Sequence, residues 1–233
     1  MKQLFIAALF FMTAATTVHA QDDAATTKDP KFIVTGNLNY AYRLAKIDKS
    51  YTGIQREYLK NLKSGVSYDI SAYYMINREL GFGLKFNSFN SSEGLNGVYV
   101  SAPNGETGYG NISDEITISF FGIGEIYKFG RSGSRHSGLL EAALGYMRYK
   151  NDAFAIDNYT LTGGTFGSAI SVAYQYEAFK NFSVGPKFAL LGGSIRKYDI
   201  EGPDGFKDRL TLGRDNQESL LRMDLGIVAS YRF

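Results

Sequence analysis

The sequence predicts an all-β fold: a closed antiparallel up-and-down transmembrane β-barrel of eight strands, preceded by a cleaved signal peptide. Three observations predict it. The last fifteen residues alternate between apolar and mostly polar side chains, seven earlier segments alternate in the same way, and the connections alternate between long and short. Together they indicate strands with one lipid-facing side and one interior side.

The C-terminal segment, residues 219–233, has the clearest pattern. Alternation with a period of two is typical of a β-strand whose two faces differ. The segment is also long enough for a tilted strand to cross a bilayer, which takes about 9–11 residues. Read backward from the end, its apolar face comprises Phe233, Tyr231, Ala229, Ile227, Leu225, Met223 and Leu221.

The N-terminal residues predict export. A single positive charge, Lys2, precedes an apolar run, and Val18 and Ala20 have the spacing of a cleavage site. We expect a signal peptide over residues 1–20, a short polar periplasmic lead over residues 21–30, and the barrel over residues 31–233. His19 is then absent from the mature protein.

Eight segments of alternating character predict the strands. In the first, Leu38 and Tyr40 alternate with Asn37 and Asn39. The fourth is ambiguous because both of its faces are apolar, and there Glu125 indicates that the odd-numbered positions face the interior. The predicted strands cover residues 32–44, 62–76, 80–87, 116–129, 139–149, 166–177, 182–193 and 219–233.

The connections support this division of the chain. Short periplasmic turns and longer extracellular loops are the arrangement of outer-membrane barrels. Pro186 lies inside the seventh segment and lacks an N–H donor, so we expect it near the periplasmic end of that strand or at a bulge. The long connections span about 45–61, 90–115, 150–165 and 196–217, and the shorter ones span 77–79, 130–137 and 178–181.

Composition excludes several classes of function. The absence of cysteine excludes a disulfide scaffold, a lipid-anchored N-terminus and thiolate metal sites. A net charge of +2 is too small to indicate nucleic-acid binding. The 17 tyrosines and 17 phenylalanines suit aromatic girdles, although the chain has no tryptophan. We expect no cofactor and no metal.

The interior positions carry charged side chains that we expect to lie in or at the rim of the lumen. An eight-stranded barrel is just wide enough for side chains to fill. Because unpaired charges there are costly, most should pair, which favours a static plug of ion pairs over a gated narrow pore. The predicted lumen charges are Arg43, Lys63, Asp69, Lys85, Glu125, Glu141, Lys187, Arg222 and Asp224.

The signal peptide, the eight segments, the short turn at Asn77–Glu79 and the closing Tyr231–Phe233 together resemble the small eight-stranded outer-membrane barrels of the OmpA-like and OmpX-like type. The resemblance covers nearly the whole mature chain and implies location in the outer membrane. It also implies that the assembly machinery reads the C-terminal strand, and that the barrel contacts outer-membrane lipid, including lipopolysaccharide. The residues of that assembly signal are Leu225, Ile227, Tyr231 and Phe233.

The sequence gives only weak indications of a catalytic site. The one histidine of the mature chain, His136, lies in the Gly/Ser-rich turn of residues 132–138, and the strand count places that turn in the periplasm. Lipid-modifying barrels use a histidine general base near the outer leaflet, which is the other side. Residues 199–204 could contact a divalent cation, although solvated loop charge explains them better. We expect no enzyme activity.

The function predicted from the sequence is a non-enzymatic one, in envelope integrity or in surface interaction through the long extracellular loops. A narrow selective channel for small solutes is the main alternative. A soluble, exported, lipocalin-like ligand carrier and a lipid-modifying enzyme are two further alternatives. Against the carrier, such proteins usually place a tryptophan near the first strand, and Leu225 and Ile227 would face water.

Overall fold

The computed structural model describes residues 31–48, 50–51, 53–102, 105–131, 133–213 and 217–233. The predicted signal peptide and polar lead, residues 1–30, lie outside the described residues. Lys31 to Phe233 form one compact unit. Within the described part of the chain, no helix has the length and apolar character needed to cross a membrane.

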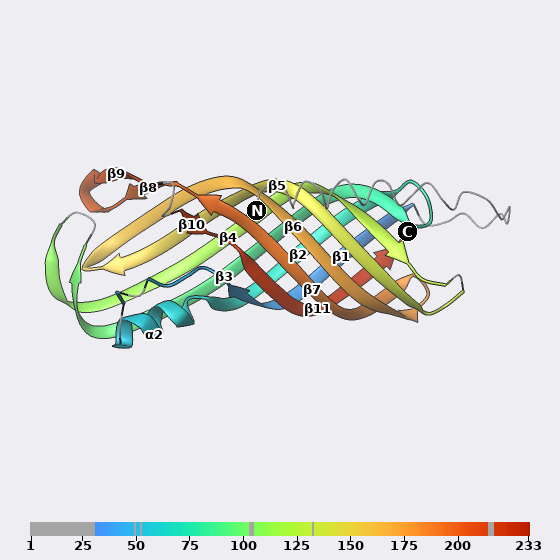
Figure 1. The fold of residues 1–233 in the computed structure, drawn as a ribbon, viewed down its shortest axis with the longest axis horizontal. Helices are drawn as coiled ribbons and strands as arrows, with labels where there is room; N and C mark the ends of the chain where they lie inside the picture. Colours follow the sequence, from blue (N-terminus) through green and yellow to red (C-terminus); the bar gives the residue numbers. More distant parts are fainter. Residues whose placement is uncertain (1–30, 49, 52, 103–104, 132, 214–216) are drawn as a thin grey trace. The chain divides into compact units, whose positions relative to one another are not determined.

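Eight long strands form a closed antiparallel barrel (Figure 1). Each long strand pairs with the next long strand along the chain, and the last pairs with β1, so the predicted closed antiparallel barrel of eight strands is confirmed. The strands are β1 (Phe32–Arg43), β2 (Ser64–Met75), β3 (Leu80–Ser101), β4 (Thr107–Phe129), β5 (His136–Ala155), β6 (Asp157–Phe179), β7 (Phe182–Ile195) and β11 (Arg222–Arg232).

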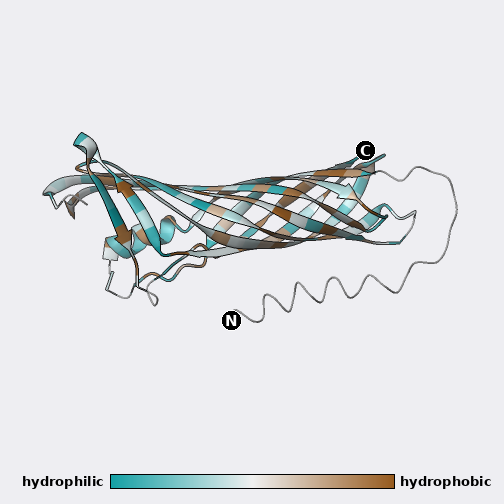
Figure 2. Cartoon of the chain, turned by 90° about the horizontal axis from the view of Figure 1, so that it is seen from above, coloured by the Kyte–Doolittle hydropathy of each residue, from teal (hydrophilic) through white to brown (hydrophobic). Residues whose placement is uncertain are grey.

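The outer face of the barrel is apolar over one band. In β1, Leu38 is 65% exposed and its neighbour Asn39 only 4%, as expected when alternate side chains face outside and inside. On β3 the exposed apolar side chains of Phe82, Leu84 and Phe86 are followed on the same face by the polar Asn90 and Ser92. Figure 2 shows the hydrophobic residues along the barrel strands. We call the part of the outer face that carries these exposed apolar side chains the apolar band.

The prediction that odd-numbered positions of β4 face inward was wrong. Ile118 and Phe120 are fully buried, whereas Phe121 and Ile123 are exposed, so the even positions face the interior. Glu125 is therefore on the outer face, where it pairs across the sheet with the exposed Phe82. A strand that is apolar on both faces carries little information on its orientation, and one glutamate near its end was insufficient evidence.

Lys63 also lies outside the lumen, contrary to prediction. A helix, α2 (Gly53–Asn61), precedes β2, and β2 begins only at Ser64. Lys63 therefore does not follow the alternation of that strand. Its ammonium lies 4.9 Å from the centre of the Tyr42 ring, on the outer side, while Leu62 is buried inside.

Four strands extend far beyond the apolar band. Residues predicted as long loops continue the ladders, because β3 and β4 pair up to Ser101 and Thr107 and β5 and β6 up to Ala155 and Asp157. The hairpin of β8 (Lys197–Glu201) and β9 (Lys207–Thr211), with the short helix η2 (Pro203–Gly205) between them, adds to the edge of β6. We call the extended parts of β3 to β6 with β8 and β9 the projecting sheet.

The short turns lie at the opposite end of the barrel. Figure 1 shows α2, β8 and β9 at one end and the C-terminus at the other. Pro186 is near the short-turn end of β7, as predicted. Its missing N–H coincides with a gap in the β6–β7 ladder between the pairs Ala173–Lys187 and Tyr176–Val184, and the register is the same on both sides of that gap.

Candidate functional site

A four-membered ion-pair cluster occupies the middle of the barrel. The Lys85 ammonium lies 3.2 Å from an Asp69 oxygen and 2.9 Å from a Glu141 oxygen. The Lys187 ammonium lies 3.1 Å and 3.0 Å from the same two oxygens. The four side chains come from β2, β3, β5 and β7 and are at most 4% exposed. Each lysine thus joins both carboxylates, and the cluster has no net charge.

A second buried pair extends this cluster toward β11. The Arg222 Nε lies 3.1 Å from an Asp224 oxygen, and the Ser67 hydroxyl donates a hydrogen bond of 2.7 Å to the other Asp224 oxygen. Arg222 also donates to the side-chain oxygen of Asn87, and its guanidinium lies 5.3 Å from the Phe89 ring centre. We call Asp69, Lys85, Glu141, Lys187, Arg222 and Asp224 the charge network. Its three acids and three bases balance.

Polar wall residues complete the hydrogen bonding of the charge network. The Ser171 hydroxyl donates to Glu141 at 2.8 Å, and the Asn37 amide donates to Asp69. A buried carboxylate is costly unless it is paired and hydrogen-bonded. The barrel interior meets that need with side chains from several strands.

Arg43, also predicted in the interior, lies at the rim. It is buried and pairs at 2.7 Å with Glu218 of the two-residue strand β10 (Glu218–Ser219). Sequence reasoning missed Glu218, because the predicted C-terminal strand began one residue later. The only sequence signal for Glu218 was Arg43 itself, a buried base to which no acid had been assigned.

Apolar side chains fill the interior on both sides of the charge network. Toward the short turns, Ile33, Tyr73, Ile126, Leu139 and Val228 form one buried cluster. Toward the projecting sheet a larger cluster forms, which includes Phe89, Ile118, Phe120, Met147, Leu191 and Ile195. The charges therefore lie between two apolar layers.

The helix α2 closes the end of the larger apolar cluster. Its Tyr58 is buried there, and the hydroxyl donates to Asp114 of β4 at 2.5 Å. Asn151 of β5 donates to the other Asp114 oxygen at 2.5 Å. Burial, followed by the bond to Asp114, raises the pKa of Tyr58 well above its ordinary value, so the hydroxyl keeps its proton and remains a donor. Neither Tyr58 nor Asp114 was predicted from the sequence.

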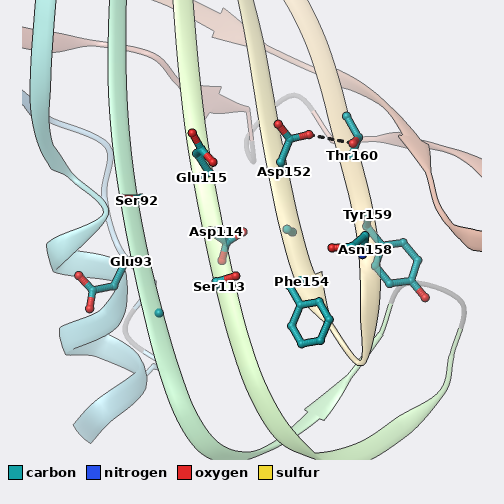
Figure 3. A pocket seen from close by; sticks show the side chains of 12 residues that line it. Ser92, Glu93, Ser113, Asp114, Glu115, Asp152, Phe154, Asn158, Tyr159 and Thr160 are labelled. Atoms are coloured by element: carbon teal, nitrogen blue, oxygen red, sulfur yellow. Dashed lines mark hydrogen bonds between the residues drawn. The ribbon is translucent and has the colours of Figure 1, made fainter.

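The projecting sheet carries an acidic groove of about 800 Å³ that is lined by residues from both faces of β3 to β6 (Figure 3). Directly paired residues of adjacent strands share a face, and here Ser92, Glu115, Asp152 and Thr160 form one such row. Asp152 accepts a hydrogen bond of 2.8 Å from Thr160 and lies 2.5 Å from the Lys150 ammonium. Carboxylates and hydroxyls of this kind suit a cationic or hydroxyl-bearing ligand.

The groove lacks the parts of a catalytic site that were considered above. Its lining contains no histidine among the described residues. His136 is at the start of β5, at the short-turn end, where its Nδ1 contacts the Tyr174 hydroxyl. No group of three or more histidine, cysteine, aspartate or glutamate side chains in the described part of the chain could hold a metal ion.

The residues of the predicted assembly signal all point outward. Leu225 and Ile227 belong to the apolar band, and Tyr231 and Phe233 are exposed at the short-turn end. The Tyr231 and Phe233 rings lie 4.7 Å apart, and the Phe233 amide donates to the Phe32 carbonyl at 2.9 Å. The C-terminus is thereby tied to the first strand.

Comparison with known proteins identifies the fold. No family model and no curated protein matches the chain. Among solved structures, Neisserial surface protein A matches with 16% identity and a TM-score of 0.53, covering 87% of this chain and 97% of that chain. OprG from Pseudomonas aeruginosa matches with 14% identity and a TM-score of 0.52, covering 91% and 99%.

A major outer membrane protein from Thermus thermophilus matches with 13% identity and a TM-score of 0.55, covering 87% of this chain and 98% of that chain. At these identities the likeness concerns the fold. The chain has the architecture of the small eight-stranded outer-membrane barrels, as its sequence resemblance implied, and this supports location in the outer membrane.

Proposed function

We propose that this protein is a non-enzymatic outer-membrane barrel that acts at the cell surface through its projecting sheet. The observation that carries the proposal is the contrast between the two ends of the molecule. Among the described residues, one end has only short turns, whereas the other continues four strands beyond the apolar band and adds α2 and the β8–β9 hairpin. Short turns in the periplasm and a large extracellular part fit the general arrangement of such barrels.

The acidic groove is the part of the projecting sheet best suited to contact a partner. Glu115, Asp152 and Thr160 lie side by side on its outer face and are accessible from solvent. We expect a basic or hydroxyl-rich partner there, because the groove offers mainly acceptors. Without a histidine in its lining, a hydrolytic role is the weaker hypothesis.

The main alternative is a narrow selective channel. The charge network would then be the gate. Against it, the network is neutral and is enclosed by two apolar layers, through which an ion would pass only after losing its water. A soluble ligand carrier also fits less well, because the apolar band would face water.

Two classes of partner follow from this proposal. We expect the apolar band to contact outer-membrane lipid, including lipopolysaccharide on the outer side. We expect the assembly machinery to recognise the C-terminal strand with Leu225, Ile227, Tyr231 and Phe233, all of which present their side chains outward.

A shortened variant tests the proposal. In it a tight turn replaces residues 92–113, and a second variant carries Glu115→Gln and Asp152→Asn with the full-length strands. We expect both to insert like the wild type, and we expect both to lose the surface phenotype of the intact protein in a deletion strain, the second because its groove no longer carries these two charges. Full complementation by the shortened variant would contradict a surface role. Stepwise conductance of the refolded wild type in planar bilayers would favour the channel.

A further inference from the structure

A cluster of polar and cationic side chains lies on the outer face of the barrel at the short-turn end. It consists of Arg135, His136, Tyr174 and Tyr176, and we call it the Arg135–His136 cluster. His136 and Tyr176 are direct cross-strand partners, and their ring centres lie 5.3 Å apart. The Tyr174 ring centre lies 5.9 Å from that of His136. All four side chains are exposed.

The hydrogen bonds in this cluster leave mainly donors for a ligand. Nδ1 of His136 contacts the Tyr174 hydroxyl, so Nε2 is the ring nitrogen available to a ligand. Arg135 donates one N–H to the Tyr176 hydroxyl at 3.4 Å, which leaves the rest of its guanidinium free to donate. The Ser134 hydroxyl accepts from the His136 amide at 3.0 Å and so orders the turn.

The surrounding charge is positive. Arg131 and Lys180, in the two turns nearest the cluster, are exposed. The carboxylate of Glu177 is on the other face of β6, where it lies 2.7 Å from Arg232 and accepts from the Asn181 amide at 3.0 Å. Glu177 also attracts Arg135 electrostatically, but its carboxylate is paired inside the barrel, and Arg131, Arg135 and Lys180 leave the outer face with a net positive charge.

The position of the cluster indicates where its ligand comes from. Tyr174 of the cluster, and Val172 next to it on the same face of β6, belong to the apolar band. Phe129 and Phe179 are exposed near the turns of the short-turn end. Aromatic side chains of this kind concentrate at the level of the lipid headgroups. A donor cluster with an arginine at that level faces phosphate groups, which arginine binds in bidentate fashion.

We propose that the Arg135–His136 cluster binds the phosphate group of one phospholipid in the periplasmic leaflet. The inference rests on the proposed orientation in the outer membrane. The Arg135 guanidinium pairs with two phosphate oxygens, the His136 Nε2–H donates to a third acceptor on the headgroup, and the two tyrosine rings contact the start of the acyl chains. The site holds an anionic headgroup more tightly than a zwitterionic one, because an ammonium group would meet Arg131 and Lys180.

Native mass spectrometry of the refolded barrel tests this inference. Wild type, the variant Arg135→Gln/His136→Gln and the control Arg78→Gln, which removes a charge from the turn between β2 and β3, are each released from nanodiscs of phosphatidylglycerol and phosphatidylcholine. Heat-modifiable mobility on gels first establishes that each of the three proteins has folded and inserted. If the protein is not a membrane barrel, this gel assay shows it before any lipid is measured. We expect one retained phosphatidylglycerol on wild type and on the control, and about tenfold less retention on the double variant.

Equal retention by the double variant and wild type would overturn the proposal, as would equal retention of the two lipids by wild type. An added arm distinguishes a free anion from a lipid. If inorganic phosphate shifts the His136 ring resonances of the detergent-solubilised wild type while no phosphatidylglycerol is retained, the site is a phosphate site but not a lipid site, and the proposal is wrong.

Discussion

The buried lysines of the charge network show how single residues are held inside a membrane barrel. Lys85 and Lys187 each contact both Asp69 and Glu141, so every member has two partners of opposite charge. Removing one member leaves an uncompensated charge among apolar layers. Removing one acid and one base together leaves a neutral pair.

This difference predicts strong coupling between Lys85 and Glu141. We expect Lys85→Met and Glu141→Gln each to lower the free energy of unfolding by about 3–5 kcal/mol. The double variant should lose much less than the sum, because Lys187 and Asp69 remain paired. Urea unfolding of the barrel in lipid vesicles measures all four proteins, and additive losses would contradict the pairing.

Leu84 represents the residues of the apolar band. It is half exposed on the outer face of β3, opposite Ala72 of β2 and Ile123 of β4. Leu84→Lys should cost about 2–4 kcal/mol if the side chain lies near the middle of the bilayer. Ser92→Lys, on the same face of the same strand beyond the band, is the control and should cost little. If Leu84→Lys and Ser92→Lys lower the free energy of unfolding in lipid vesicles equally, Leu84 does not lie in the lipid-facing zone.

Among the elements, the helix α2 is attached mainly through Tyr58. The pKa of Tyr58 is raised by burial and by Asp114, so its bond stabilises the docked helix at neutral pH and below about pH 10, the ordinary tyrosine value. Stability is lost as the pH rises above that value toward the raised pKa of the folded state. A spin label at Lys60→Cys should therefore become more mobile above about pH 10.

The variant Tyr58→Phe provides the control for this pH effect. It cannot ionise at position 58, so its spin label should show no corresponding step, although the helix should already be less firmly attached by about 0.5–1.5 kcal/mol at neutral pH. An identical pH step in Tyr58→Phe would assign the change to another group.

The C-terminal segment, β11 with the Phe233 that follows it, is predicted to act in assembly through Phe233. This side chain is exposed, so its removal should cost the folded barrel little packing energy. Deleting Phe233 should nevertheless lower the amount of protein in the outer membrane, because we expect the assembly machinery to recognise the terminal aromatic residue. Phe179→Ala, which removes another exposed aromatic ring from the same end, should leave that amount unchanged. Cell fractionation followed by immunoblotting measures the amount of the Phe233 deletion variant and of Phe179→Ala in the outer membrane.

For the whole molecule, the sequence was sufficient to predict the barrel because the period of two is imposed by the bilayer on one side and a narrow interior on the other. Beyond the bilayer these constraints end, and there the sequence did not predict the strand ends correctly. β3 and β4 continue beyond the apolar band with polar side chains on their outer face, for which Asn90 to Ser101 gave no apolar alternation.

The interior charges show the same limit. Asp69 and Glu141 were predicted to lie inside from alternation alone, and they do. Glu125 was misplaced because β4 is apolar on both faces, and Lys63 because a helix precedes its strand. The contact between Tyr58 and Asp114 joins residues 56 positions apart, which no local pattern can indicate.

Side-specific cysteine labelling tests the central claim most directly, namely that the projecting sheet is outside the cell and the short turns are inside the envelope. The chain has no cysteine, so Asp204→Cys in η2 and Glu79→Cys in the turn before β3 are clean probes, and both positions are exposed. A membrane-impermeant thiol reagent added to intact cells should label Asp204→Cys rapidly and Glu79→Cys only after the outer membrane is permeabilised. Equal labelling of the two in intact cells, or labelling of Glu79→Cys alone, would contradict the account.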